Sequence, residues 1–230
     1  MFNFENDVII VTGAAQGMGK GVSFALANLG ATVCMLDKSD SIKNSAKELN
    51  DEGYKVYDYV CDVTDSKSVK DTFKMIEKQH GIIHKLVNVA GISASVDFTS
   101  DEIDAIKDKI MDVNFNGIWN TCRNVIPYMI KNGGGSIVNF SSVTGNIVSD
   151  PGMSAYAASK GAVSALTRSL AIEFADRNIN INAILPGYVW TDMLKKYNPE
   201  DPDEVKKRFS KGIPMKRLGS VEEAGSIVAF

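Results

Sequence analysis

Short runs of apolar residues alternate along the chain with longer segments in which apolar residues recur every three or four positions. The short runs lack polar alternation, as expected for strands of a parallel sheet that are buried on both faces. The longer segments have the period of amphipathic helices. The pattern predicts an α/β fold, a doubly wound parallel sheet with helices on both faces, whose strands lie at 8–11, 31–36, 55–60, 85–89, 136–140 and 179–185.

Helices are predicted between these strands. The glycine-rich stretch after the first strand leads into a helix that ends near residue 29, and others are expected at 42–52, 66–79, 113–130 and 155–175. Thr99 and Ser220, each followed three residues later by a glutamate, fit capping boxes that start helices. Pro127 is expected to kink or end the helix that contains it.

Residues 192–217 have a different composition, rich in charge and containing three prolines. We interpret this segment as a mobile flap over a substrate site, with a short helix near 204–211. The basic run at its centre, Lys206, Lys207 and Arg208, fits a solvated face or an attraction for acidic groups. The rest of residues 1–230 forms a single dinucleotide-binding and catalytic domain in this interpretation.

Composition excludes several classes of partner. The 230 residues are 44% hydrophobic and 23% charged with a net charge of −3, which gives no reason to expect nucleic acid or an anionic membrane as a partner. No uncharged apolar stretch is long enough to span a bilayer, and no signal peptide is expected at the N-terminus. The three cysteines include no CxxC pair, so a reduced, cytoplasmic protein is predicted.

His80 and His84, the two histidines, are predicted to be solvent-exposed, and no metal site is expected.

A nucleotide site is predicted at the first turn between a strand and a helix. Gly13, Gly17 and Gly19 allow a tight turn there and the close approach of a pyrophosphate to a helix N-terminus, although packing turns also contain glycines. Asp37 ends the second strand, where a carboxylate would bind the ribose hydroxyls of adenosine. That carboxylate favours NAD over NADP because it would repel a 2′-phosphate, whereas the adjacent Lys38 could pair with one.

Two further polar residues follow predicted strands. Asp62 and Asn88 come at the carboxyl ends of the third and fourth strands, where ligands bind in open parallel sheets. Both could contact adenine or ribose, and both could equally form turns or helix caps.

A proton-handling site is predicted from Ser142, Tyr156 and Lys160. On a helix the tyrosine and the lysine share one face, because they are four residues apart. A free tyrosine has a pKa of about 10, and we expect the lysine cation to lower that pKa. The alternative for the pair alone is a half-buried tyrosine beside a lysine that reaches solvent.

Together, residues 12–19, 88–91, 133–160 and Asn114 resemble the short-chain dehydrogenase/reductase family, in the family's order and over essentially the whole chain. The resemblance implies a Rossmann fold that binds a nicotinamide dinucleotide. It implies that Tyr156 is the general acid/base and that Lys160 lowers the tyrosine pKa and holds the nicotinamide ribose. It also implies that Ser142 polarises the substrate oxygen and that Asn114 supports a proton relay. It also implies cofactor contacts, in addition to Asp37, Tyr156 and Lys160, at Gly13, Gly17, Met18, Gly19, Asp62, Val63, Asn88, Ala90, Gly91, Pro186, Gly187, Val189 and Thr191.

Two features depart from the family pattern. Val89 stands where the family usually has a second asparagine. The family also continues with a final strand beyond the position of Phe230, so either this sequence is incomplete or the sheet lacks that strand and has an exposed edge.

The expected function is hydride transfer between NAD(H) and a small-molecule secondary alcohol or ketone, such as a hydroxysteroid or another cyclic alcohol. One alternative is a 3-oxoacyl-[acyl-carrier-protein] reductase. Arg177 fits one of the two carrier-docking arginines of such enzymes, but Gly133 stands at the other place. A non-catalytic dinucleotide sensor or scaffold is a second alternative. The resemblance implies a homotetramer or homodimer that pairs the helices at 113–130 and 155–175, whereas burial of the second helix within one subunit is the alternative.

Overall fold

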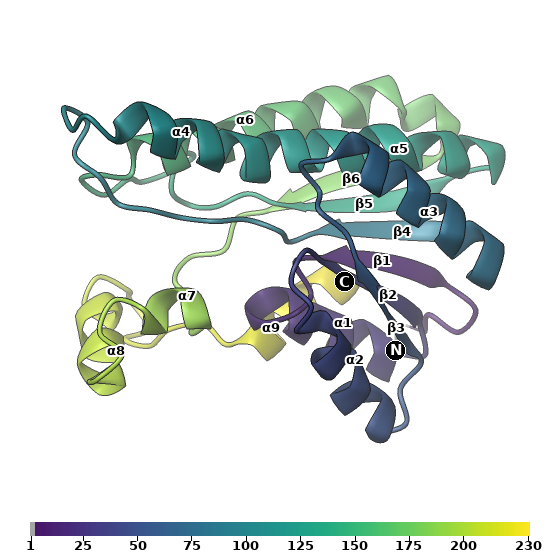
Figure 1. Cartoon of the computed structure of the whole chain (residues 1–230), viewed down its shortest axis with the longest axis horizontal. Coiled ribbons are helices and arrows are strands. Elements are labelled where there is room, and N and C mark those ends of the chain that lie inside the picture. The colour runs from purple at the N-terminus through teal and green to yellow at the C-terminus, as the bar shows by residue number, and fades with distance from the viewer. Residues whose placement is uncertain (1–2) are drawn as a thin grey trace.

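Six parallel strands form one sheet in the computed structural model, which describes residues 3–230 (Figure 1). The order across the sheet is β3-β2-β1-β4-β5-β6. The predicted strands agree with the observed ones to within two residues at each end. The strands are β1 (Val8–Thr12), β2 (Thr32–Asp37), β3 (Val56–Val60), β4 (Ile83–Asn88), β5 (Gly135–Phe140) and β6 (Ile179–Ile184).

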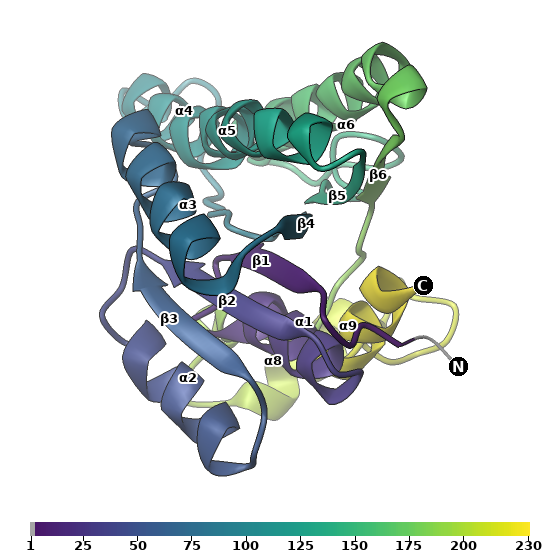
Figure 2. The same cartoon turned by 90° about the vertical axis from the view of Figure 1, so that its right-hand side faces the viewer.

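Helices cover both faces of the sheet, as predicted (Figure 2). One face carries α1 (Gly17–Asn28), α2 (Ile42–Asp51) and α9 (Val221–Ala229), and the other carries α3 (Ser66–His80), α4 (Ile103–Met111), α5 (Gly117–Lys131) and α6 (Ser154–Glu173). Each face buries its own apolar core. The core on the face covered by α3 contains three fully buried residues that share one face of that helix: Val69, Phe73 and Ile76.

The α4–α5 region differs from the prediction. The predicted helix start is at Thr99, and α4 begins four residues later, at Ile103. The helix then continues through one π-helical turn at Asp112–Asn116 into α5, so the predicted start at 113 falls within a continuous helix. The capping box predicted at Thr99 is wrong, because the N-cap residue of α4 is Glu102 and makes no side-chain capping hydrogen bond. Thr99 instead lies in a turn, where the Asp97 carboxylate accepts from both its amide and its hydroxyl. Pro127 does not end α5, which continues to Lys131.

The flap contains two short helices, α7 (Asp192–Lys195) and α8 (Pro202–Ser210), beyond the end of β6 (Figure 1). The chain then returns to α9, whose predicted capping box is present: the Ser220 hydroxyl accepts from the Glu223 amide, and the Glu223 carboxylate accepts from the Ser220 amide. Gly21 of α1 and Gly225 of α9 let these helices approach closely, because a Cβ on Gly225 would lie 3.0 Å from the Gly21 carbonyl oxygen.

β6 pairs with β5 alone within residues 3–230, so it lies at an edge of the sheet. In the same part of the chain, no helix is both long and apolar enough to cross a membrane.

Candidate active site

The site lies where the strand order reverses, between β1 and β4. Chain connections leave these neighbouring strands in opposite directions, which opens a crevice at their carboxyl ends. Thr12 ends β1, and its hydroxyl accepts hydrogen bonds from the backbone amides of Val89 at 3.1 Å and Ala90 at 3.2 Å. This contact fixes the loop after β4 against the glycine turn.

The glycine turn leaves room that side chains would fill. Gly13 has φ +66°, and a Cβ there would lie 2.7 Å from the Ala90 Cα. A Cβ on Gly19 would lie 2.1 Å from the Gly13 carbonyl oxygen. Helix α1 has neither a side-chain cap nor an acidic residue in its first turn, so its first amides and its dipole face this space without competition. The turn therefore fits the pyrophosphate of a dinucleotide.

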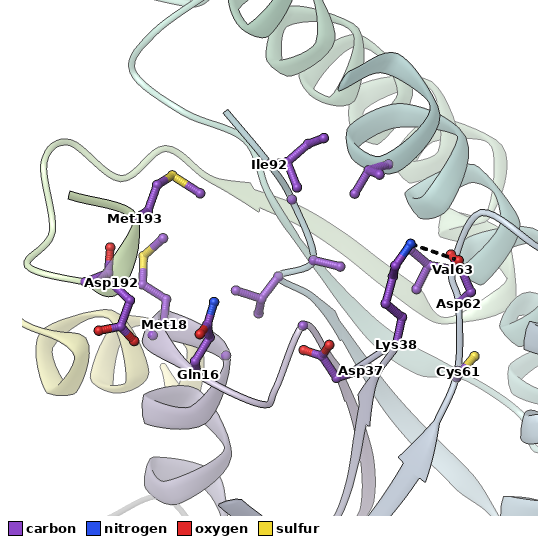
Figure 3. A pocket seen from close by; sticks show the side chains of 18 residues that line it. Gln16, Met18, Asp37, Lys38, Cys61, Asp62, Val63, Ile92, Asp192 and Met193 are labelled. Atoms are coloured by element: carbon purple, nitrogen blue, oxygen red, sulfur yellow. Dashed lines mark hydrogen bonds and ion pairs between the residues drawn. The ribbon is translucent and has the colours of Figure 1, made fainter. Parts of the chain in front are cut away.

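A cavity of about 260 Å³ lies beside this turn (Figure 3). Asp37 borders it, with a carboxylate that accepts from the backbone amides of Ala15 at 3.2 Å and Ser39 at 2.9 Å. Lys38 reaches across the ends of β2 and β3 to Asp62, with 3.3 Å between Nζ and Oδ2. Burial opposes ionisation of Asp62, but hydrogen bonds from Thr64 and the contact with Lys38 outweigh it and lower the pKa of this carboxyl.

Most of the predicted cofactor residues line this cavity. They are Gly13, Gly17, Met18, Gly19, Asp37, Asp62, Val63, Ala90, Gly91 and Thr191. Pro186, Gly187 and Val189 do not line it. Val189 instead forms a bridge with Gly219, which fixes the segment that ends at Thr191.

Sequence reasoning missed six lining residues. Gln16, Ile92 and Val113 are direct neighbours of predicted residues, which was the only signal for them. Asp192 and Met193 begin the flap, and Cys61 follows β3. The six are Gln16, Cys61, Ile92, Val113, Asp192 and Met193.

The Asn88 side chain does not line the cavity, because both of its amide atoms are used inside the fold. It is 1% exposed, and its amide nitrogen donates to the Asn139 side chain at 2.8 Å. Its amide oxygen accepts from the Thr121 hydroxyl at 2.8 Å. Asn88 therefore joins β4 to β5 and α5 in a buried polar network.

The three predicted catalytic side chains, those of Ser142, Tyr156 and Lys160, come together at the carboxyl end of β5. Ser142 follows the strand, and its Oγ accepts from the Thr144 amide at 3.1 Å. Lys160 is 4% exposed, and its ammonium donates to the Phe140 carbonyl at 2.8 Å and lies 5.7 Å from the centre of the Tyr156 ring. The helix thus brings the tyrosine and the lysine together, as their spacing predicted.

Burial dominates the acid–base properties of this group. It raises the pKa of the Tyr156 phenol above its usual value of 10.0, although a hydrogen bond with Ser142 acts in the opposite direction. Burial also lowers the pKa of Lys160 from 10.5 to about 8. Lys160 does not contribute to the shift of the Tyr156 pKa in this arrangement, so the lowering of that pKa by Lys160 stays a prediction.

Asn114 lies within the π-helical turn and is fully buried. Its Oδ1 accepts from the Ile92 amide at 2.8 Å, and its Nδ2 donates to the Ile92 carbonyl at 3.0 Å and to the Ser159 hydroxyl at 3.0 Å. A Cβ on Gly91 would lie 3.3 Å from the Asn114 Oδ1 and 3.4 Å from the Lys160 Nζ. Asn114 and Lys160 therefore flank the same glycine of the loop after β4.

Metal-binding clusters of three or more suitable side chains are absent from residues 3–230. The two histidines are half-buried rather than exposed as predicted. The Nε2 of His80 lies 2.8 Å from the Tyr59 hydroxyl, and the Nδ1 of His84 accepts from the Val8 amide at 3.1 Å.

Comparison with known proteins identifies relatives over nearly the full chain. The family model described as short chain dehydrogenase matches residues 7–202. Oxidoreductase UcpA of Escherichia coli (strain K12) is 42% identical over 225 residues, which cover 96% of this chain and 85% of that protein. The 3-oxoacyl-[acyl-carrier-protein] reductase FabG of Thermotoga maritima is 38% identical over 230 residues, which cover 98% of this chain and 90% of that protein.

A similar arrangement is found among solved structures. The ligand-free aldohexose dehydrogenase of Thermoplasma acidophilum superimposes with a TM-score of 0.89 at 32% identity. The match covers all of this chain and 88% of that one.

Proposed function

The chain belongs to the short-chain dehydrogenase family and is an NAD(P)-dependent oxidoreductase, and from this premise we propose that it interconverts a neutral secondary alcohol and its ketone with NAD(H). The observation that carries the proposal is the convergence of Ser142, Tyr156 and Lys160 at the carboxyl end of β5, where Lys160 lies beside Gly91 of the cavity lining. The bound cofactor would supply or accept the hydride. The protein must then position the substrate oxygen and move one proton.

Tyr156 is the proposed proton donor to a ketone oxygen and acceptor from an alcohol. Its raised pKa keeps the phenol protonated at neutral pH, which suits it to act as the acid in carbonyl reduction. The Ser142 hydroxyl would donate a second hydrogen bond to the same oxygen. Lys160 is proposed to turn toward the ribose hydroxyls of a bound cofactor, and its cation would then stabilise the phenolate that forms after proton transfer.

The proposed cofactor is NAD(H) rather than NADP(H). The Asp37 carboxylate borders the cavity and would repel a 2′-phosphate. Lys38, the cation that could offset this repulsion, is paired with Asp62. Gly13, Gly17, Gly19 and the amides at the start of α1 would hold the pyrophosphate.

The flap supports a neutral, ring-sized substrate. Tyr188, Tyr197 and Phe209 pack together there, and aromatic side chains of this kind bind apolar ring faces. The Asp150 carboxylate is hydrogen-bonded to Tyr188 and would disfavour an anionic substrate. We therefore propose cyclic alcohols, hydroxysteroids among them, as the substrate class.

Reduction of a 3-oxoacyl group on a carrier protein is the second candidate, and 38% identity to a FabG supports it. Arg177 is half-exposed near the end of α6, with its Nε 3.9 Å from the Asp176 carboxylate, but Gly133 supplies no second docking cation. A sensor or scaffold without catalysis is disfavoured, because all three proton-handling side chains are present and converge.

A panel of carbonyl compounds tests the proposal. Purified protein is assayed at 340 nm with NADH and with NADPH against cyclic ketones, 3-ketosteroids, a sugar acid ketone and an acetoacetyl thioester, and the corresponding alcohols are assayed with NAD. We expect the highest kcat/KM with NADH and a cyclic ketone. Preference for NADPH and the thioester would favour the second candidate, and absence of turnover throughout would contradict an active dehydrogenase.

We further propose that the enzyme is cytoplasmic and forms a homotetramer or homodimer through α5 and α6. Trp119 on α5 and Ile172 on α6 support this arrangement, since they expose 47% and 82% of their surface on the outer side of these helices. Light scattering on the purified protein tests the assembly, and a monomer at micromolar concentration would contradict it.

A further inference from the structure

We propose that Tyr188 is a positioning residue that holds the flap over the catalytic tyrosine through a hydrogen bond to Asp150, which we call the flap latch. This inference rests on the proposed function. It assigns a role in substrate binding to two residues that neither touch the cofactor cavity nor belong to the proton-handling group.

The flap latch joins two loops that border the proposed substrate site. The Tyr188 hydroxyl donates to the Asp150 Oδ2 at 2.6 Å across 38 residues of sequence. Tyr188 follows β6, and Asp150 belongs to the loop between Ser142 and α6. The other side of Tyr188 is fixed through its backbone, because its carbonyl accepts from the Gly219 amide at 2.9 Å.

Aromatic contacts continue from the flap latch into the flap. The Tyr188 ring packs against Phe209 of α8 with 4.9 Å between ring centres, and Phe209 packs against Tyr197 at 5.2 Å. Tyr197 lies close enough to both Tyr188 and Tyr156, the proposed acid, for its phenolate form to raise the pKa of either phenol. The flap latch is therefore connected, through two ring contacts, to a phenol that lies near the reacting groups.

The C-terminal end of the flap is anchored by the bidentate ion pair of Arg217 with Glu223, but α7 and α8 have few other anchors. Val205 is the one buried residue of α8, and Leu194 is the one buried residue of α7. Lys206 lies over the Trp190 ring at 4.9 Å, which adds a partly exposed contact. With so little buried surface, a hydrogen bond from Tyr188 to a carboxylate forms a large share of what fixes α8 relative to Tyr156.

Kinetics of four variants test this role with the best ketone from the panel. Tyr188→Phe removes the hydrogen bond and keeps the ring, and Asp150→Ala removes the acceptor. Each should raise the ketone KM by roughly 3- to 10-fold, the range expected for one partly exposed hydrogen bond, with kcat and NADH affinity within about twofold of wild type. Asp150→Asn keeps an acceptor oxygen and should restore most of the loss. The double variant Tyr188→Phe/Asp150→Ala should be no worse than either single change.

Limited trypsin digestion provides a readout that does not depend on turnover. Cleavage near Lys206, Lys207 and Arg208 should be faster in Tyr188→Phe than in wild type, by a factor similar to the KM change. Tyr54→Phe is the matched control, because its hydroxyl bonds Asn28 at 3.3 Å and its ring packs on Phe24 rather than on the aromatic side chains of the flap.

Two results separate failure of this inference from failure of the proposed function. If Tyr188→Phe matches Tyr54→Phe in both KM and cleavage rate, the flap latch has no positioning role. If wild type reduces no carbonyl compound, the proposed function fails, and the cleavage rates alone then decide whether Tyr188 fixes the flap.

Discussion

Replacing Lys160 by methionine should stabilise the cofactor-free protein while it abolishes activity. Burial lowers the pKa of Lys160 from 10.5 to about 8. At roughly 1.4 kcal/mol for each pKa unit, holding the protonated lysine in the fold costs on the order of 3 kcal/mol at pH 7. Methionine has a similar length and carries no charge, but it loses the hydrogen bond to the Phe140 carbonyl, worth about 1.5 kcal/mol or more because the donor is charged. The expected net gain is about 1 kcal/mol in the free energy of unfolding.

The pH dependence of this gain follows from the direction of the shift. Since the folded-state pKa is depressed, the unfolded chain holds the Lys160 proton between pH 8 and 10.5 when the folded chain has lost it. The free energy of unfolding of the wild type therefore rises with pH across that window, relative to a variant that lacks this lysine. The advantage of Lys160→Met should be largest at and below pH 7 and should fall by on the order of 2 kcal/mol by pH 10.

Urea unfolding, followed by tryptophan fluorescence without nucleotide, measures both effects. Wild type, Lys160→Met and the control Lys70→Met, at an exposed lysine of α3, are compared at pH 7, 8.5 and 10. The control should change the free energy of unfolding by less than about 0.5 kcal/mol at each pH. The reasoning is refuted if Lys160→Met destabilises the protein at pH 7, or if its difference from wild type does not change up to pH 10.

Three other changes probe the cofactor site and the core. Asp37→Asn should raise the ratio of NADPH to NADH kcat/KM by about tenfold or more, because it removes the charge that repels a 2′-phosphate, and an unchanged ratio in steady-state assays would contradict this role. Gly13→Ala should abolish NADH binding in fluorescence titrations and lower stability by about 2 kcal/mol or more, since its Cβ would lie 2.7 Å from the Ala90 Cα. Phe73→Ala should cost about 3–5 kcal/mol in urea unfolding while the nucleotide affinity of the folded protein is kept, and a cost below about 1 kcal/mol would mean that α3 is poorly packed.

The strands could be predicted because burial on both faces leaves a simple pattern. Ile9 and Ile10 are successive residues that face opposite sides of the sheet, and both are fully buried. The start of α4 could not be predicted in the same way. The Asp97 carboxylate accepts from both the amide and the hydroxyl of Thr99 and forms a turn there, and a capping motif does not indicate which local hydrogen bonds will form.

The glycine turn was predictable because its chemistry lies in adjacent residues, whereas Asn88 was not. Its partner Asn139 is 51 residues away, so only tertiary structure shows that the amide is used internally. The direction of the Tyr156 pKa shift also required the fold. Spacing brings Lys160 onto the same helix face, but burial, which decides the direction, depends on everything packed around the pair.

The most direct test of the central claim is Tyr156→Phe, assayed with the ketone that wild type reduces best. If Tyr156 is the acid, kcat should fall by roughly 10²- to 10⁴-fold, while the Kd for NADH stays within about twofold of wild type. Tyr128→Phe, at a half-buried tyrosine of α5, is the control and should keep wild-type turnover. Turnover by Tyr156→Phe above about a tenth of the wild-type rate, with NADH bound normally, would contradict the account.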